Sequence, residues 1–201
     1  MNNADNGHEL LVKLAKKGKM EAFESLVRLN ETKIYNICLR MLGNKDDALD
    51  ASQDTFIKAY KNISRFDERS KFSTWLYRIA VNTSLDMLRK SRSMNTVSMD
   101  DVKEDSYGAY EKMPSPEGNP ESITLENEGK AEVLSAMEKL SEEYKTALVL
   151  RDLQGLSYIE ISQITDTSLG TVKSRIARGR KNLRDILTGG NVMSLKGGDL
   201  I

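Results

Sequence analysis

The chain has 201 residues, of which 39% are hydrophobic and 30% are charged, and this balance suits one or two globular domains with some polar linker. No apolar run is long enough to cross a membrane, and the N-terminus lacks the layout of a secretion signal, so we expect a cytoplasmic protein with no membrane insertion. A single cysteine and a single histidine exclude an internal disulfide and a structural zinc site.

The sequence also lacks the usual marks of an enzyme. No glycine-rich phosphate-binding loop is present. A nucleophile pair of Cys38 with His8 is formally possible, but Cys38 lies between Ile37 and Met41 in an apolar pattern that favours a core position. We therefore expect no catalytic residue, no metal and no cofactor, and we predict that the protein is not an enzyme.

Charge is distributed unevenly, although 30 basic residues balance 30 acidic residues overall. Residues 1–92 hold 17 basic and 12 acidic side chains, residues 93–128 hold 2 and 9, and residues 129–201 hold 11 and 9. All three prolines lie in the acidic middle, which shows neither a helical nor an alternating apolar pattern. This composition predicts a flexible acidic linker over 93–128. The alternative is an irregular but ordered loop.

The first block, residues 1–92, predicts a helical domain. Three leucines over residues 10–14 recur at helical spacing, and Gly18 provides a stop. A longer pattern of apolar residues runs from Phe23 to Met41 and ends at Gly43.

Two more helices are predicted in this block. Asn44 fits the N-cap of a third helix. That helix carries small residues on one face, namely Ala48, Ala51, Thr55 and Ala59. After a polar loop near 65–70, the apolar spacing that starts at Phe72 predicts a fourth helix.

The third block, residues 129–187, predicts a helix-turn-helix. Ser141 fits the cap of a helix that ends at Gly155. Ser157 and Glu160 form the Ser-x-x-Glu pattern of a capping box, which predicts a short helix to about residue 164. After a turn over 165–167, Ser168 can cap a basic last helix. Residues 188–201 form a tail to which we assign no role.

The last helix separates apolar from basic residues. At about 100° per residue, one stripe is apolar, comprising Leu169, Val172, Ile176, Gly179, Leu183, Ile186 and Leu187. Gly179 is expected to let the first helix approach closely. Thr171, Ser174, Ala177, Arg178 and Lys181 lie opposite the stripe, and Lys173, Arg175, Arg180 and Arg184 flank it.

These positions indicate how the helix would bind DNA. In a helix-turn-helix, residues near the start of the second helix reach base edges and flanking basic residues contact phosphates. Thr171, Ser174 and Arg178 therefore suit base reading, whereas readout by Ala177 should be weak. The alternative is a solvated amphipathic helix whose charges only keep it soluble.

Three stretches together resemble the extracytoplasmic-function subfamily of bacterial RNA polymerase sigma factors. They are "DALDASQDTFIKAYKNISRF" at 47–66, "FSTWLYRIAVNTSLDMLRK" at 72–90 and "LSYIEISQITDTSLGTVKSRIARGRKNLRDIL" at 156–187. The resemblance implies an all-α protein that binds core RNA polymerase and directs it to selected promoters. Its domain over 1–92 would recognise and open the minus-ten element, and its domain over 129–187 would read the minus-thirty-five element.

The resemblance also implies roles for particular residues. Asp47, Asp50, Gln53 and Asp54 make one acidic-polar face, which suits a basic helical partner, and the family identifies that partner as the coiled coil of the largest polymerase subunit. On spacing alone, an ordinary exposed helix face is the alternative.

The minus-ten site is implied in the same way. Residues 58–92 hold nine basic and three acidic side chains beside several aromatic ones, a composition suited to unpaired DNA. The loop over 65–71 and Asn82 would form the pocket for a flipped base, while Phe72 and Trp75 fit the core better. The candidate minus-ten residues are Arg65, Phe66, Lys71, Arg78, Asn82, Arg89 and Lys90.

The partners expected from the resemblance are core RNA polymerase, promoter DNA and an anti-sigma factor, and we expect the free protein to be a monomer. We also expect the acidic linker to compete with DNA for the two basic domains when polymerase is absent. Two other functions remain open. One is a dimeric repressor or activator that binds duplex DNA by itself, and the other is an adaptor that binds polymerase without reading DNA.

Overall fold

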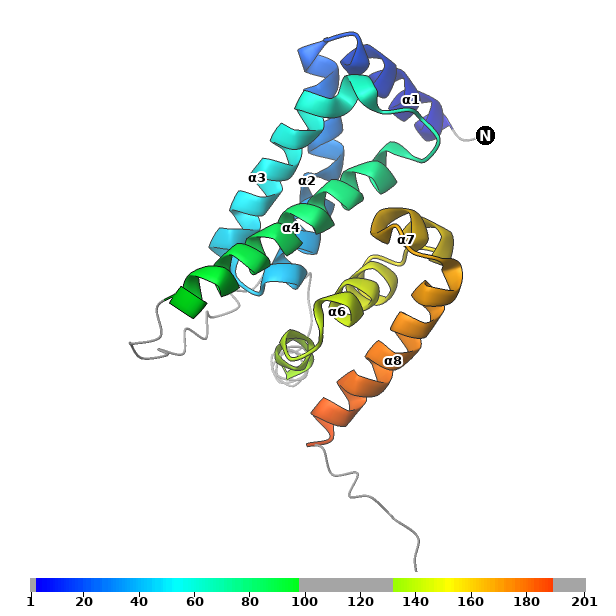
Figure 1. Cartoon of the computed structure of the whole chain (residues 1–201). Helices are drawn as coiled ribbons and strands as arrows, with labels where there is room; N and C mark the ends of the chain where they lie inside the picture. The colour runs from blue at the N-terminus through cyan, green and yellow to red at the C-terminus, as the bar shows by residue number, and fades with distance from the viewer. Residues whose placement is uncertain (1–2, 98–131, 190–201) are drawn as a thin grey trace, which may run out of the picture.

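The structure is a computed structural model that describes residues 3–97 and 132–189, and these residues contain helices and no strand (Figure 1). The N-terminal helices are α1 (Asn3–Lys16), α2 (Met20–Leu42), α3 (Lys45–Asn62), η1 (Ile63–Arg65) and α4 (Phe72–Val97). The C-terminal helices are residues 132–138, α6 (Glu142–Leu148), η2 (Val149–Leu153), α7 (Tyr158–Thr165) and α8 (Leu169–Leu187). The predicted all-α fold with two helical domains is confirmed. In the described ranges, no helix has the length and apolar character needed to span a membrane.

The boundary between α2 and α3 follows from two residues. Gly43 has a φ of 84°, a left-handed conformation that glycine adopts without a Cβ penalty, and its N–H donates to the Leu39 carbonyl. The Asn44 side chain then caps α3, because its Oδ1 accepts from the Asp47 N–H at 2.8 Å. These two predicted signals are confirmed, and they turn α3 back along α2.

The N-terminal core lies between α2, α3 and α4. Apolar residues of α2 such as Ile34 and Ile37 are fully buried, and so are Ala48 and Ala51 of α3. Small side chains on α3 let α2 approach it closely. Cys38 is fully buried in the same core, and burial raises the pKa of its thiol to about 11, so it is an inert core residue.

An aromatic cluster closes the loop between η1 and α4. Phe66 is 4% exposed, and its ring centroid lies 5.9 Å from that of Phe72 and 5.2 Å from that of Trp75. Lys16 of α1 holds the loop from outside, because its Nζ donates to the Phe66 carbonyl at 2.8 Å and pairs with Glu68 at 2.6 Å. The start of α4 is therefore fixed in place by both apolar and polar contacts.

After the helix over 132–138, the C-terminal domain continues with a helical segment over 142–153 whose second half is irregular. After α6, residues 149–153 form the π-helical turn η2 rather than a regular end of the predicted helix. The predicted capping box is confirmed, since the Glu160 N–H donates to Ser157 Oγ at 3.2 Å and Glu160 Oε2 accepts from the Ser157 N–H at 2.9 Å. Ser168 Oγ likewise caps α8 by accepting from the Thr171 N–H at 3.1 Å.

Gly179 marks a close approach, as predicted, but the partner is α6 rather than the first helix of the helix-turn-helix. A Cβ added to Gly179 would lie 3.2 Å from Leu148 Cγ and 3.3 Å from Tyr144 Cβ. The buried Val172 and Ile176 continue this apolar contact along α8. The segment before the helix-turn-helix therefore forms the main support of the basic helix.

The predicted linker, residues 93–128, lies mostly outside the described residues. Helix α4 continues to Val97, five residues into the segment predicted as linker. The remainder of that segment, 98–128, lies outside the described residues, as do 190–201 of the predicted tail.

The two domains pack against each other through α4 and α7 (Figure 1). The Thr146 hydroxyl of α6 lies 3.7 Å from the sulfur of Met41 in α2, and Arg92 of α4 pairs with Glu142 of α6 at 2.5 Å. Side chains of both domains thus contribute to one interface.

The role of Gly179 is testable by overpacking. Gly179→Val should lower the free energy of unfolding by about 1–3 kcal/mol, because the new methyl groups would collide with Tyr144 and Leu148. Gly170→Val is the matched control on the same helix, where an added Cβ meets only Ser168 Oγ at 3.7 Å, so its effect should stay within about 0.5 kcal/mol. Urea unfolding followed by circular dichroism measures both, and equal stability of the two variants would contradict the packing argument.

Candidate nucleic-acid and polymerase-binding surfaces

A pocket of about 440 Å³ lies where η1 meets α4, and it brings together two of the predicted minus-ten residues, Arg65 and Asn82. Lys58 and Asn62 of α3 line another side, and the half-buried Trp75 forms an apolar wall. Lys58 is oriented by its hydrogen bond to Thr83 Oγ1 at 3.0 Å. The pocket therefore combines cationic and amide groups and one carboxylate, that of Asp86, with one aromatic ring. Its cationic, amide and aromatic groups can hold an unpaired base and its phosphate.

Other candidates for the minus-ten surface lie elsewhere along α4. Arg89 lines a second pocket between the two domains, and Arg78 pairs with Asp166 of the C-terminal domain at 3.5 Å. Lys90 lies beside the acidic face of α3 rather than in the pocket with Asn82. Lys71 is exposed in the loop before α4. The predicted minus-ten residues therefore do not share one pocket: they are distributed over α4, the loop before it and separate pockets, two of which share Asn82.

Phe66 differs from the other candidates because its ring is buried in the aromatic cluster. In this conformation the ring has no free face on which a base could stack. Its position indicates a structural role, which is to hold the loop that carries Arg65. Phe72 and Trp75 pack against it, as expected from their apolar spacing.

The four predicted polymerase-binding residues share one groove. Asp47, Asp50, Gln53 and Asp54 of α3 line a cavity of about 610 Å³ together with Ile57, Met87, Lys90 and Ser91. Ile57 is 50% exposed, and Leu49, one turn before Gln53 on the same helix, is 51% exposed. The groove therefore offers acidic groups beside exposed apolar side chains, a combination that fits a basic amphipathic helix.

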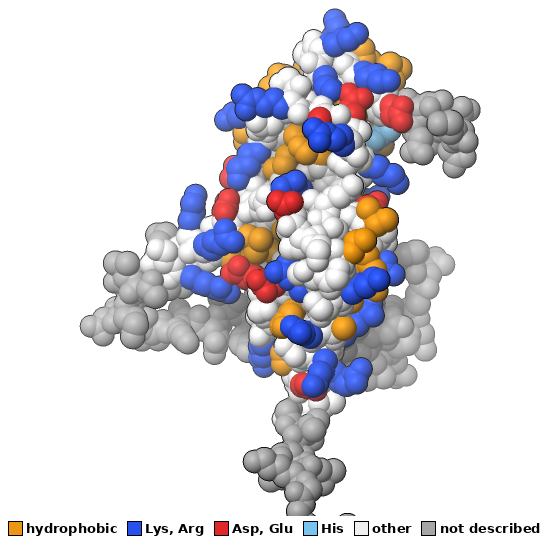
Figure 2. Space-filling view, turned by 45° about the vertical axis from the view of Figure 1, so that its right-hand side comes forward, with side chains coloured by type: hydrophobic (Ala, Val, Ile, Leu, Met, Phe, Trp, Pro, Cys, Tyr) orange, Lys and Arg blue, Asp and Glu red, His pale blue; other side chains and the backbone are white. Residues whose placement is uncertain are grey.

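The basic helix α8 presents most of its predicted DNA-binding side chains to solvent. Lys173, Ala177, Arg178 and Lys181 are exposed, and Thr171 and Ser174 are half-buried. Figure 2 shows Lys and Arg side chains over the whole of the face in view, including its lower part toward the end at which α8 terminates. Ser174 Oγ donates to the Thr171 carbonyl at 2.9 Å, so its lone pairs remain available to accept from a base.

Two basic residues of α8 are already paired within the domain. Arg175 lies 3.2 Å from Glu143 of α6, and its side chain is only 24% exposed. Arg180 bonds Asp152 through two nitrogens, with Nε at 3.1 Å from Oδ2. Arg180 therefore ties α8 to η2, and Arg175 is less available to DNA than the sequence suggested.

Several groups with shifted pKa values lie along the contact between α4 and the C-terminal domain. Hydrogen bonds from the Ser157 N–H and hydroxyl hold the pKa of Glu160 below its ordinary value, with a smaller contribution from the charge of Lys71. Burial raises the pKa of Tyr77, and the Glu160 carboxylate adds to this. Burial lowers the pKa of Lys145, opposed by Glu138 and aided by Arg92. Charges from both domains therefore influence one another.

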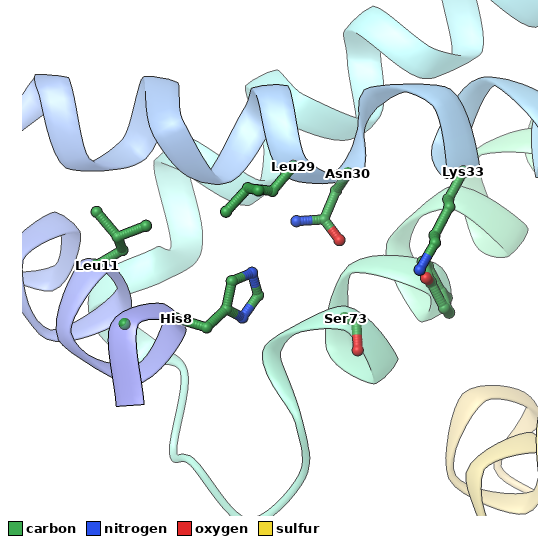
Figure 3. Close-up of a pocket in the computed structure, with 8 residues that line it drawn as sticks. His8, Leu11, Leu29, Asn30, Lys33 and Ser73 are labelled. Atoms are coloured by element: carbon green, nitrogen blue, oxygen red, sulfur yellow. The ribbon is translucent and has the colours of Figure 1, made fainter. Parts of the chain in front are cut away.

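A fourth cavity, of about 720 Å³, lies between α1, α2 and the start of α4 (Figure 3). His8, Asn30, Lys33 and Ser73 converge on it, with Leu11 and Leu29 as apolar walls. Asn30 is 4% exposed and donates to the Leu26 carbonyl at 2.8 Å. None of these residues belongs to the sites predicted from sequence, because they lie far apart along the chain and form no motif.

Sequence reasoning counted Lys58 in the basic stretch 58–92 without naming it as a minus-ten residue, and it missed Asn62 and the acidic residues that face α4 from the C-terminal domain. Lys58 is spaced at i, i+4 from Asp54 and precedes Asn62 by one turn, a signal that could have extended the minus-ten surface onto α3. No sequence signal pairs Asp166 with Arg78, because their contact depends on how the two domains pack.

Comparison with known proteins identifies both domains. The sigma-70 region 2 model matches residues 26–94, and the sigma-70 region 4 model matches residues 130–183. The chain is 39% identical over 173 residues to the ECF RNA polymerase sigma factor SigW of Bacillus subtilis (strain 168), covering 86% of this chain and 92% of the relative. It is 37% identical over 177 residues to the ECF RNA polymerase sigma-E factor of Escherichia coli (strain K12), covering 86% and 90%.

Two solved structures share the fold. One is CnrH in complex with the cytosolic domain of CnrY, with a TM-score of 0.66, 24% identity, and coverage of 91% of this chain and 98% of that chain. The other is the sigma factor RpoE in complex with the anti-sigma factor NepR from Bartonella quintana, with a TM-score of 0.65, 24% identity, and coverage of 84% and 98%. Together with the two region matches and the curated relatives, this shows that the chain belongs to the extracytoplasmic-function family of sigma factors, which are transcription initiation factors that bind RNA polymerase and promoter DNA.

Proposed function

We propose that the protein divides promoter recognition among three surfaces, one for each contact that a transcription initiation factor has to make. The pocket formed by Arg65, Asn82 and Lys58 captures an unpaired minus-ten base. The exposed side of α8 reads the minus-thirty-five element. The groove beside Asp50 and Asp54 binds core polymerase.

The minus-ten assignment rests on the convergence of three elements in one pocket. Arg65 comes from η1, Asn82 from α4 and Lys58 from α3, so residues up to 24 positions apart line the same space. A base that leaves the duplex loses its stacking and its hydrogen bonds. An aromatic face can replace the stacking, at about 1–3 kcal/mol for each stacked base, and an amide can replace hydrogen bonds. Trp75 and Asn82 offer both. Promoter opening in this proposal uses binding energy alone, with no catalytic residue.

The minus-thirty-five assignment follows from exposure and from the caps of α8. Ser168 fixes the start of the helix, so that Thr171, Ser174 and Arg178 follow one another on the side away from the core. Arg178 carries a planar guanidinium suited to the paired acceptors of guanine in the major groove. Lys173 and Arg184 flank this line and suit phosphates, and Lys181 continues the line one turn beyond Arg178.

The polymerase assignment follows from the mixed character of the α3 groove. Exposed Ile57 and Leu49 supply apolar area, and four acidic or amide side chains supply complementarity to a basic helix. We propose core RNA polymerase and promoter DNA as the partners. A further proposed partner is an anti-sigma factor, by analogy with NepR, which forms such a complex with RpoE of Bartonella quintana. We propose that the free protein is a cytoplasmic monomer.

Transcription with purified components tests this function. Core polymerase and fragmented genomic DNA are mixed with and without the protein, and the 5′ ends of the RNA are sequenced. We expect start sites that depend on the protein and share two elements more than one helical turn apart. Binding to a palindrome without polymerase would favour the repressor, and polymerase binding with no new start site would favour the adaptor.

The α8 assignment predicts different effects for two arginines. Arg178→Ala should weaken binding to the matched minus-thirty-five element by about 1–3 kcal/mol and lose discrimination at one position. Arg184→Ala should weaken binding equally on matched and scrambled elements and reduce the salt slope by about one unit. Both side chains are exposed, so neither change should unfold the domain. Holoenzyme binding at several salt concentrations distinguishes them, and uniform losses in both variants would remove Arg178 from base reading.

The minus-ten pocket predicts a defect confined to promoter opening. Asn82→Ala should spare polymerase binding and minus-thirty-five contact, because Asn82 is exposed and lines neither the α3 groove nor the outward side of α8, although it also borders the pocket between the two domains. Permanganate footprinting reports unpaired thymines, and we expect fewer of them in the variant. Transcription from a template already melted at the start site is the control, and it should be near the parent level. An equal loss on duplex and melted templates would count against a role of Asn82 in opening.

A further inference from the structure

We propose that Asp86 makes the minus-ten pocket reject thymine, so that the unpaired base held there is one that carries an exocyclic amine. The proposal rests on the proposed function, because it assumes that the pocket formed by Arg65, Asn82 and Lys58 holds an unpaired base. It deepens that function by naming a class of base and the side chain that selects it.

Asp86 brings a carboxylate to a pocket whose other charged groups are cations. It lines the pocket together with Lys58 of α3 and Arg65 of η1. Asn82 precedes Asp86 by four residues on α4, so the two side chains share one helix face and lie one turn apart. Because a carboxylate repels phosphate, the part of a nucleotide that Asp86 can bind favourably is the base.

The Asp86 carboxylate is open to a ligand. Its Oδ1 accepts from Arg89 Nη1 at 3.5 Å, which is the long limit of a hydrogen bond. Both side chains are more than half exposed, at 66% for Arg89 and 57% for Asp86, so this pair is weak. Within the part of the chain that the structure describes, no donor bonds Oδ2. A base can therefore donate to the carboxylate without displacing a strong partner.

The other polar and aromatic groups of the pocket suit any base. Lys58 and Arg65 donate hydrogen bonds, for which every base has an acceptor, and the amide of Asn82 both donates and accepts. The ring of Trp75 can stack on any base, because every base has a π-face. An ionised carboxylate, by contrast, accepts hydrogen bonds and donates none. Asp86 is therefore the group that distinguishes bases by the hydrogens on their edges.

Thymine is the base that fits this carboxylate least. Cytosine and adenine present an amino group where thymine presents its O4 carbonyl, and guanine presents the N2 amino group. The single N–H of thymine lies between two carbonyl oxygens, so a carboxylate that approaches it also faces those oxygens. An amine-bearing base therefore gains a charge-assisted hydrogen bond, whereas thymine leaves the carboxylate poorly paired.

The alternative role of Asp86 is charge balance. In that role the carboxylate only offsets the charges of Lys58 and Arg65, and its removal would change DNA binding alike for every base. Base selection, in contrast, changes the preference at one position of the minus-ten element. A test therefore has to read base preference position by position rather than total affinity.

The test uses a promoter found by sequencing the 5′ ends of RNA, with every position of its minus-ten element randomised. Core polymerase and the full chain form open complexes on this pool. Sequencing of the recovered DNA against the input gives the enrichment of each base at each position. Asn82→Ala marks the position held in the pocket, because the base preference at that position should differ from the parent's.

Asp86→Asn is the main variant, because it removes the charge and adds an amide that can donate to thymine O4. Glu24→Gln is the matched control, which makes the same change at an exposed position of α2 outside the pocket. At the marked position we expect the parent and the control to deplete thymine about tenfold, and Asp86→Asn at most about twofold. Asp86→Ala removes the acceptor without adding a donor, and it should also lessen the depletion.

The outcomes separate this inference from the proposed function. If the parent opens promoters but accepts thymine at the marked position, or if both Asp86 variants retain the depletion, the selection by Asp86 is wrong and the function stands. An effect of Asp86→Asn that is equal at all positions would leave charge balance only. If Asn82→Ala alters no position, the pocket holds no base, and both this inference and the minus-ten assignment fail. If no open complex depends on the protein, the proposed function fails and the inference fails with it.

Discussion

The structure depends on the two-sided character of α4. One side of this helix buries Leu76 and Ala80 in the N-terminal core, while the opposite side carries arginines and Asn82 at the surface. A helix can hold both roles because side chains three or four residues apart share a face. The C-terminal domain meets the basic side with acidic groups, Asp166 beside Arg78 and Glu142 beside Arg92.

Rigid support explains how these exposed groups are positioned. The aromatic cluster around Phe66 and the pair of Lys16 with Glu68 hold the start of α4, and Lys58 is oriented by Thr83. In the C-terminal domain, the close contact at Gly179 fixes α8 against α6. The proposed DNA-binding side chains therefore extend from well-packed helices, which would reduce the entropy lost on binding.

Local signals in the sequence were sufficient for much of the fold. Asn44, Ser157 and Ser168 predicted helix starts that the structure confirms, because a cap depends on residues within one turn. The same reasoning could not give the partner of Gly179 or the burial of Arg175, since both depend on contacts between distant segments. The grouping of Asp47, Asp50, Gln53 and Asp54 was accessible from helical spacing, whereas the joining of Arg65 with Asn82 in one pocket came only from the family resemblance.

The structure packs the two domains together, whereas the proposed function requires them to reach two promoter elements more than one helical turn apart. The most direct measurement is the distance between spin labels on Glu24→Cys in α2 and Asn182→Cys in α8, two exposed positions. Cys38 should not interfere, because it is buried and its thiol pKa is raised to about 11. We predict one narrow distribution for the free protein and a shift to longer distances in the complex with polymerase and promoter DNA. A broad distribution in the free protein, or the same distance in both states, would contradict the account.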